Sequence, residues 1–164
     1  MPRRPGWGRR GALLLVLLFA AGGAPADAEP RRFDGDSYRT ILESHRGKPF
    51  LMVFWSLECP PCYKELRMLG EAGAGERFTA VFVSTDGPAA SARITETLDR
   101  FGLEQAESWV FAGPPRRLRY TVDPRWYGEL PRSYLFDAAH DRKAFSGVLE
   151  HTDLDPLLEG TAAE

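Results

Sequence analysis

The stretch "FWSLECPPCYKEL", residues 54–66, contains both cysteines of the chain, Cys59 and Cys62. Two thiols at this spacing, with two prolines between them, suit a redox couple, half of a metal site or a structural disulfide. The stabilisation that a disulfide gives falls as the loop it closes becomes shorter. A ring closed between Cys59 and Cys62 constrains almost nothing, so the sequence argues against a purely structural disulfide.

Metal binding is the second use to weigh. Structural zinc usually has four protein ligands, but the chain has no second cysteine pair. Its histidines, His45, His140 and His151, are scattered without ligand spacing. Two thiolates alone can bind Cu(I), so a copper carrier stays open as an alternative. Met52 and Met68 flank the motif but are interpreted as buried core residues, which favours redox chemistry.

The beginning of the chain has the layout of a secretory signal. Residues 1–10 hold four arginines and no acid, and an apolar run, "GALLLVLLFAAGGA", follows at residues 11–24. Small residues with Ala-x-Ala patterns come next and end at Ala28, which suits a cleavage site. The run is shorter than the roughly 20 residues that a membrane span needs. We therefore predict a signal peptide over 1–28, with an N-terminal membrane anchor as the alternative, and a periplasmic or otherwise extracytoplasmic location.

The remainder, residues 29–164, is long enough for one domain with its own hydrophobic core. The whole chain has 21 basic and 23 acidic residues, and residues 1–28 contain four arginines and Asp27. Residues 29–164 thus keep 17 basic and 22 acidic residues, a net charge of about −5. Neither nucleic acid nor an acidic membrane is expected as a partner. The one basic cluster, Arg116, Arg117 and Arg119, is interpreted as a solvated face.

Hydrophobic patterning predicts strands that alternate with helices and end in a hairpin. Residues 30–33 are interpreted as a linker. The predicted strands are 49–56, 77–86, 108–113, 131–137 and 142–150. The predicted helices are 36–48, 60–73, 87–103 and 153–160, with a helical turn at 116–120. This order predicts an α/β sandwich with a mixed sheet. The cysteines fall at the carboxyl end of a buried strand, where sites gather in such sheets.

The predicted helix start gives the two cysteines different roles. Free N–H groups and the positive end of the helix dipole face the Cys59 sulfur and favour its thiolate, which is the attacking species. Pro60 and Pro61 suit the first helical positions because no N–H donor is needed there. We predict an exposed Cys59 that attacks and a covered Cys62 that resolves the mixed disulfide.

The segments "VFWSLECPPCYKEL" (53–66) and "GELPRSYLFD" (128–137) resemble the thioredoxin superfamily, above all the exported TlpA/ResA-type disulfide reductases. The resemblance covers roughly residues 35–160. It implies a thioredoxin-like three-layer sandwich, with a mixed central sheet flanked by helices. It also implies that Pro131 is the cis-proline beside the C-x-x-C motif. Glu65 matches a glutamate that tunes the cysteines in such proteins, the alternative being a solvated helix residue.

Three positions depart from the family pattern. Val53 stands where classical thioredoxins have a buried aspartate, Glu58 where the family usually has tryptophan, and Arg67 where a proline is common. Proton transfer during resolution must then use Glu65, Glu58 or water. A carboxylate at Glu58 opposes thiolate formation on its neighbour Cys59.

The resemblance implies a thiol–disulfide oxidoreductase of the cell envelope, acting as a monomer without a cofactor. Its expected partners are exported proteins with cysteines or disulfides. Whether such a pair reduces or oxidises depends on its potential, but the relatives mostly reduce. A reductant needs an electron donor, here a membrane thiol–disulfide transporter. The alternatives are a thioredoxin-like Cu(I) metallochaperone and, more weakly, a thiol peroxidase, since the adjacent Cys62 suits disulfide resolution better.

Overall fold

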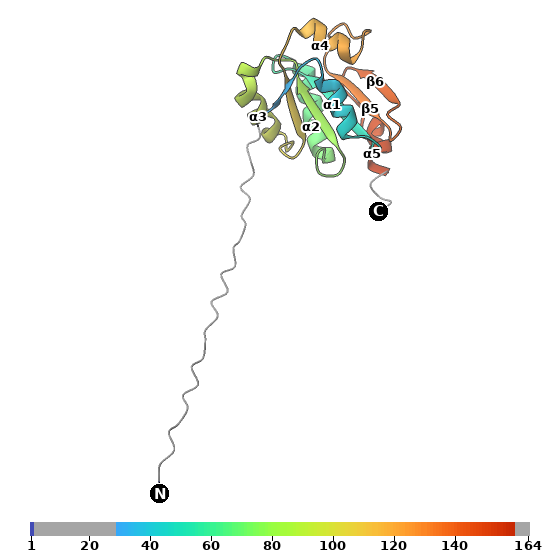
Figure 1. Cartoon of the computed structure of the whole chain (residues 1–164). Helices are drawn as coiled ribbons and strands as arrows, with labels where there is room; N and C mark the ends of the chain where they lie inside the picture. The colour runs from blue at the N-terminus through green and yellow to red at the C-terminus, as the bar shows by residue number, and fades with distance from the viewer. Residues whose placement is uncertain (2–28, 160–164) are drawn as a thin grey trace.

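The computed structural model of the chain describes Met1 and residues 29–159 (Figure 1). Residues 2–28 of the predicted signal peptide, with the end of its cleavage pattern at Ala28, therefore lie outside the described residues. The helices found within 29–159 are too short or too polar to cross a bilayer.

Within residues 29–159, six strands form one mixed sheet in the order β1-β4-β3-β2-β5-β6. The parallel part consists of β1 (Arg31–Phe33), β4 (Glu107–Phe111), β3 (Ala80–Ser84) and β2 (Phe50–Trp55). The antiparallel part consists of β5 (Arg132–Phe136), which pairs with β2, and β6 (Arg142–Ser146). Strand β2 is buried along its whole length because helices cover both of its faces.

The sheet and the helices on its two faces form three layers. An apolar cluster fills the space between the sheet and the helices on each face. Leu51, Val53 and Trp55 of β2 face one cluster, which α2 (Pro60–Ala72), α3 (Ser91–Arg100) and α5 (Asp155–Glu159) complete. Phe50, Met52 and Phe54 face the other cluster, which α1 (Ser37–Ser44) and α4 (Pro115–Val122) complete. This arrangement confirms the predicted thioredoxin-like three-layer sandwich.

The structure corrects two of the predicted elements. Residues 30–33 are not a linker, since β1 runs parallel to β4 at the sheet edge. Only Phe33 of this short strand is buried, so no alternating pattern marked it. The hairpin's second strand ends at Ser146 rather than at 150, because Gly147 turns the chain with a φ of 88°. Short 3-10 turns, Pro88–Ala90 and His151–Leu154, precede α3 and α5.

Candidate active site

The two cysteines lie where β2 gives way to α2, as predicted. They form a disulfide with a Cα–Cα distance of 5.3 Å. Cys59 is the N-cap residue of α2, and its sulfur accepts a hydrogen bond from the Cys62 N–H at 3.3 Å. Pro60 and Pro61 occupy the first helical positions. The Cys62 N–H also donates to the Cys59 carbonyl oxygen at 3.0 Å, so the Cys59 sulfur shares an N–H of the first helical turn.

The exposure of the two cysteines differs, but less than the sequence analysis predicted. Cys59 keeps 8% of its surface exposed and Cys62 none. The expectation of an openly exposed Cys59 is wrong because the residue packs in the same apolar cluster as Trp55 and Leu57. Solvent reaches the pair only through Cys59. Cys59 is therefore still the more exposed of the two cysteines, as predicted.

The turn that leads into the disulfide is held by Asp86, just beyond β3. Its carboxylate accepts the Leu57 N–H at 2.9 Å and the Ser56 hydroxyl at 3.2 Å. The Ser84 hydroxyl donates to it at 2.7 Å, and the Tyr63 hydroxyl donates to the Leu57 carbonyl at 2.9 Å. Sequence reasoning missed this brace, whose only signal was a polar "STD" after a buried strand at the same sheet edge.

Glu65 comes three residues after Cys62 on α2 and is fully buried. Its carboxylate accepts the Ser133 hydroxyl at 2.6 Å and the Leu149 N–H at 3.3 Å. Burial raises its pKa to about 7, although both hydrogen bonds act in the opposite direction. The alternative of a solvated helix residue is therefore wrong. Val53, which replaces the buried aspartate, is apolar core opposite Ser133 in the β2–β5 register.

Pro131 immediately precedes β5, and the Leu130–Pro131 peptide bond is cis. Phe54 pairs with Arg132, so Pro131 comes next to the end of β2, from which the cysteine segment continues. Pro131 is buried, and Leu130 packs against the cluster that contains both cysteines. Pro131 thus lies at the same sheet edge as the disulfide.

Glu58, the acid beside Cys59, points into solvent. Its side chain is 83% exposed, and a carboxylate oxygen lies 3.8 Å from the guanidinium of Arg93 on α3. That counter-charge weakens the predicted opposition to a thiolate. Arg67, in place of the common proline, extends over the Phe101 ring at 5.8 Å.

The residues around the disulfide do not add support to the alternative of a Cu(I) carrier. Across residues 29–159, no three His, Cys, Asp or Glu side chains gather closely enough to hold a metal ion. Met52 faces the apolar cluster on the opposite side of the sheet. Met68 packs on the cysteine side, but it is six residues from Cys62 along α2, about 9 Å of helix. His45 Nε2 lies 3.0 Å from Glu107.

Comparison with known proteins identifies the fold through structure. No protein-family model and no curated protein matches the chain. A secreted Mycobacterium tuberculosis disulfide oxidoreductase homologous to E. coli DsbE superimposes with a TM-score of 0.54 at 19% identity, covering 74% of this chain and 86% of that chain. M. tuberculosis DsbF gives 0.55 at 20% identity, covering 73% and 84%.

A secreted thiol-disulfide isomerase from Corynebacterium glutamicum gives a TM-score of 0.54 at 18% identity, covering 74% of this chain and 75% of that chain. At these identities the likeness is one of fold, and the fold is thioredoxin-like.

Proposed function

We propose that the chain is a thiol–disulfide oxidoreductase of the cell envelope, which reduces disulfides of exported proteins through Cys59 and Cys62. The observation that carries this proposal is the Cys59 sulfur at the N-cap of α2, where it accepts the Cys62 N–H. Solved structures with the same fold include a secreted disulfide oxidoreductase and a secreted thiol-disulfide isomerase, which supports the assignment.

In the reducing direction, the Cys59 thiolate attacks one sulfur of a substrate disulfide. The substrate S–S bond breaks, a mixed disulfide with Cys59 forms, and the other substrate sulfur leaves as a thiolate that takes up a proton. The Cys62 thiolate then attacks the Cys59 sulfur and releases the second substrate thiolate. Two electrons pass from the cysteine pair to the substrate, and the pair ends as the Cys59–Cys62 disulfide.

The resolving step needs an acceptor for the Cys62 proton. Glu65 is the buried carboxylate one helical turn along α2 from Cys62, and its pKa of about 7 suits proton uptake near neutral pH. The cis-proline, Pro131, presents backbone to the substrate beside the sulfurs, as the family resemblance implies. The dithiol exchange balances without a cofactor, and a membrane thiol–disulfide donor returns the pair to the reduced state.

The proposal is tested by insulin reduction with dithiothreitol as the electron source, followed by precipitation of the freed B chain. We expect wild-type protein to accelerate precipitation and the Cys59→Ser/Cys62→Ser double variant to leave it at the uncatalysed rate. Metal analysis of the purified reduced protein discriminates against the copper carrier. Stoichiometric Cu(I) binding together with no disulfide exchange would overturn the proposal.

A further inference from the structure

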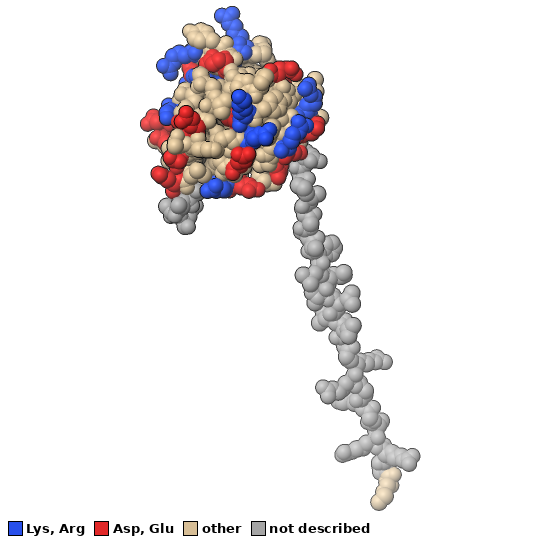
Figure 2. All heavy atoms as spheres, turned by 180° about the vertical axis from the view of Figure 1, so that it is seen from behind, with Lys and Arg blue, Asp and Glu red and all other residues tan. Residues whose placement is uncertain are grey.

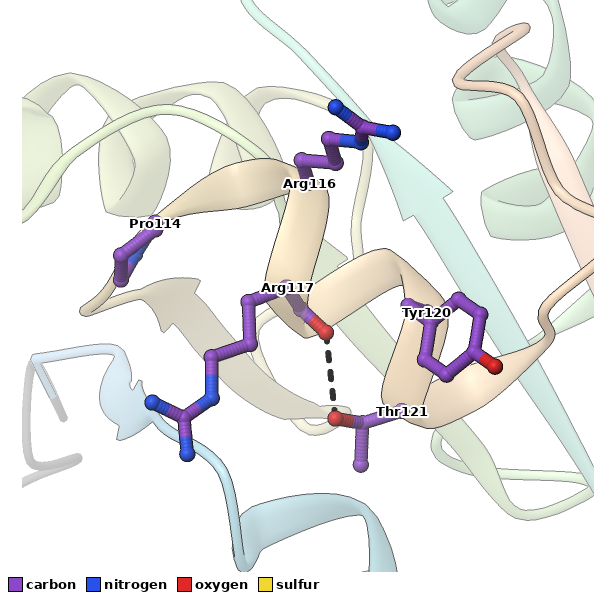
Figure 3. A pocket seen from close by; sticks show the side chains of 5 residues that line it. All are labelled: Pro114, Arg116, Arg117, Tyr120 and Thr121. Carbon is purple, nitrogen blue, oxygen red and sulfur yellow. Dashed lines mark hydrogen bonds between the residues drawn. The ribbon is translucent and has the colours of Figure 1, made fainter.

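A group of exposed arginines and tyrosines lies on α4 and in the segment that follows it. The outward surface of α4 carries Arg116, Arg117 and Tyr120, while Leu118 and Val122 are buried beneath. Figure 3 shows the side chains of Arg116, Arg117 and Tyr120 extending from the helix in different directions. With Pro114 and Thr121 they line an open pocket of about 470 Å³. We call these three residues, with Arg125 and Tyr127 beyond the helix, the α4 face.

The fold does not account for four of these five side chains, the exception being Arg125, whose guanidinium lies 3.6 Å from the buried carboxylate of Asp123. Tyr120 is 66% and Tyr127 88% exposed, which makes them the two most exposed large hydrophobic residues within 29–159. Arg116 and Arg117 have no carboxylate partner in the described part of the chain. The interpretation of a solvated basic cluster fits these two arginines but not Arg119, which is half-buried.

The α4 face belongs to the helical layer on the opposite side of the sheet from the disulfide, but it starts at the same sheet edge. Strands β4 and β2 run parallel, so the start of α4 and the start of the cysteine segment lie at the same sheet edge. After α4 the chain returns along this edge to Pro131. The Arg119 guanidinium packs over Gly128, so closely that a Cβ atom added to Gly128 would lie 3.2 Å from the guanidinium. This contact connects α4 to the segment that returns to Pro131.

The returning segment is held firmly in place. The Trp126 indole N–H donates to the Glu129 carbonyl at 2.9 Å, and its ring lies 4.7 Å from that of Phe54. Arg132 donates to the buried carboxylate of Asp123 at 3.1 Å. The α4 face is therefore presented on a braced segment that ends at the cis-proline.

The chemistry of the α4 face favours an acidic partner. Arginine binds carboxylates through a planar, bidentate fork, and tyrosine offers broad contact area at low entropic cost. Charges of both signs are interspersed over the surface that Figure 2 shows, and residues 29–164 are net acidic. Acidic segments are thus repelled by the molecule as a whole, and unpaired arginines supply a local attraction.

We propose that the α4 face docks an acidic segment of the exported proteins whose disulfides this chain exchanges. The inference rests on the proposed function and adds the substrate class. An acidic segment held at this face brings a nearby substrate disulfide to Cys59. It also raises the rate of exchange, because the attacking and receiving sulfurs are held near one another.

The first test is binding, which does not depend on redox chemistry. A fluorescein-labelled, cysteine-free peptide rich in Asp and Glu is titrated with the full mature protein and followed by anisotropy. We expect Arg116→Glu/Arg117→Glu to weaken binding at least about tenfold, equivalent to about 1.4 kcal/mol. The matched control is Arg46→Glu/Lys48→Glu, which makes the same charge change at exposed positions before β2, at the opposite end of that strand. The control should keep wild-type affinity.

The second test is exchange with three peptide disulfides that differ only in flanking residues: acidic, neutral or basic. Wild type should prefer the acidic peptide, and the α4-face variant should lose that preference while reducing the neutral peptide at the wild-type rate. The preference should fade at high salt. Tyr120→Ala should weaken acidic-peptide binding severalfold without changing exchange with the neutral peptide.

Equal effects of both double variants would overturn the docking proposal, because they would reflect net charge alone. It would also be overturned if wild type bound anionic phospholipid vesicles but not the acidic peptide. If wild type reduces no disulfide at all while binding the acidic peptide through the α4 face, the proposed function fails and the docking surface stands.

Discussion

The two cysteines differ in solvent exposure, and this difference predicts that their serine variants behave differently. Cys62 is fully buried, and Cys59 alone reaches the surface. Cys62→Ser should accumulate mixed disulfides with substrate, because attack at Cys59 still occurs but resolution is lost. Cys59→Ser should form none. Mass spectrometry of alkylated reaction mixtures measures both, and a covalent adduct of Cys59→Ser would reverse the assigned roles.

The raised pKa of Glu65 predicts that the free energy of unfolding depends on pH. Its pKa is raised to about 7 in the folded protein, so between its ordinary value and 7 the folded state binds more protons than the unfolded state. Stability therefore falls as pH rises through this window, by roughly 3 kcal/mol in total. In Glu65→Gln the amide can still accept one hydrogen bond and donate to Ser133, so the variant should fold.

Urea unfolding of the oxidised protein at pH 5 and pH 8 checks this dependence. The difference between the two pH values should be smaller for Glu65→Gln than for wild type, because the group that loses its proton is gone. Other carboxylates contribute equally to both proteins and cancel. The same pH dependence in the variant would show that Glu65 is not its source.

Glu58 predicts a small effect on Cys59 reactivity. An ionised carboxylate beside the sulfur disfavours the thiolate, but this one is exposed and shares its charge with Arg93. Glu58→Gln should lower the Cys59 pKa slightly, and the difference should disappear at high salt. Thiolate absorbance titrations of the reduced proteins measure it. An unchanged or higher Cys59 pKa in the variant at low salt would mean that Glu58 is only a surface residue.

At the scale of elements, the turn between β2 and α2 depends on Asp86. Asp86→Ala leaves the Leu57 N–H and the Ser56 hydroxyl without their acceptor, and such a loss costs about 1–3 kcal/mol. We expect a lower free energy of unfolding and slower disulfide exchange, since the segment before Cys59 is no longer fixed. Asp86→Asn keeps one acceptor oxygen and should lose less of both. Equal exchange rates in all three proteins would contradict the assigned role of the brace.

The elements also explain what the sequence could predict. Strand β2 was predictable because all six of its residues are buried and apolar, and α2 because prolines mark its first turn. Strand β1 was not, since two of its three residues are exposed arginines. The cysteine motif located the site, but the cover of Cys59 and the surroundings of Glu65 come from distant chain segments. Ser133 and Leu149 lie 68 and 84 residues from Glu65.

At the scale of the whole molecule, the stabilities of the oxidised and reduced forms are linked to the reduction potential by a thermodynamic cycle. If folding favours the disulfide over the dithiol, the folded pair is a stronger reductant than the same pair in an unfolded chain. Each 1.4 kcal/mol of preference corresponds to about 30 mV. Unfolding experiments on the two forms therefore measure how far the fold shifts the reduction potential of the pair, and in which direction.

The structure favours the disulfide. Reduction would place a thiol or thiolate at Cys62, which is fully buried about one helical turn before Glu65 on α2, and burial and a nearby like charge both disfavour a thiolate. The opposing contribution is the N–H that Cys59 receives at the start of α2, and a helix terminus contributes about 0.3–1 kcal/mol. We therefore expect the oxidised protein to be the more stable form at pH 7.

Urea unfolding of the oxidised protein and of the protein kept reduced with excess dithiol measures the two free energies. The oxidised form should unfold at higher urea, and the difference between the two free energies of unfolding is the preference of the fold for the disulfide. The reduction potential measured independently against a dithiol buffer must agree with this difference. Glu65→Gln should narrow the gap at pH 8, where the wild-type carboxylate is ionised. A reduced form more stable than the oxidised one would make the folded pair more oxidising than the same pair in an unfolded chain, which would contradict the proposed direction.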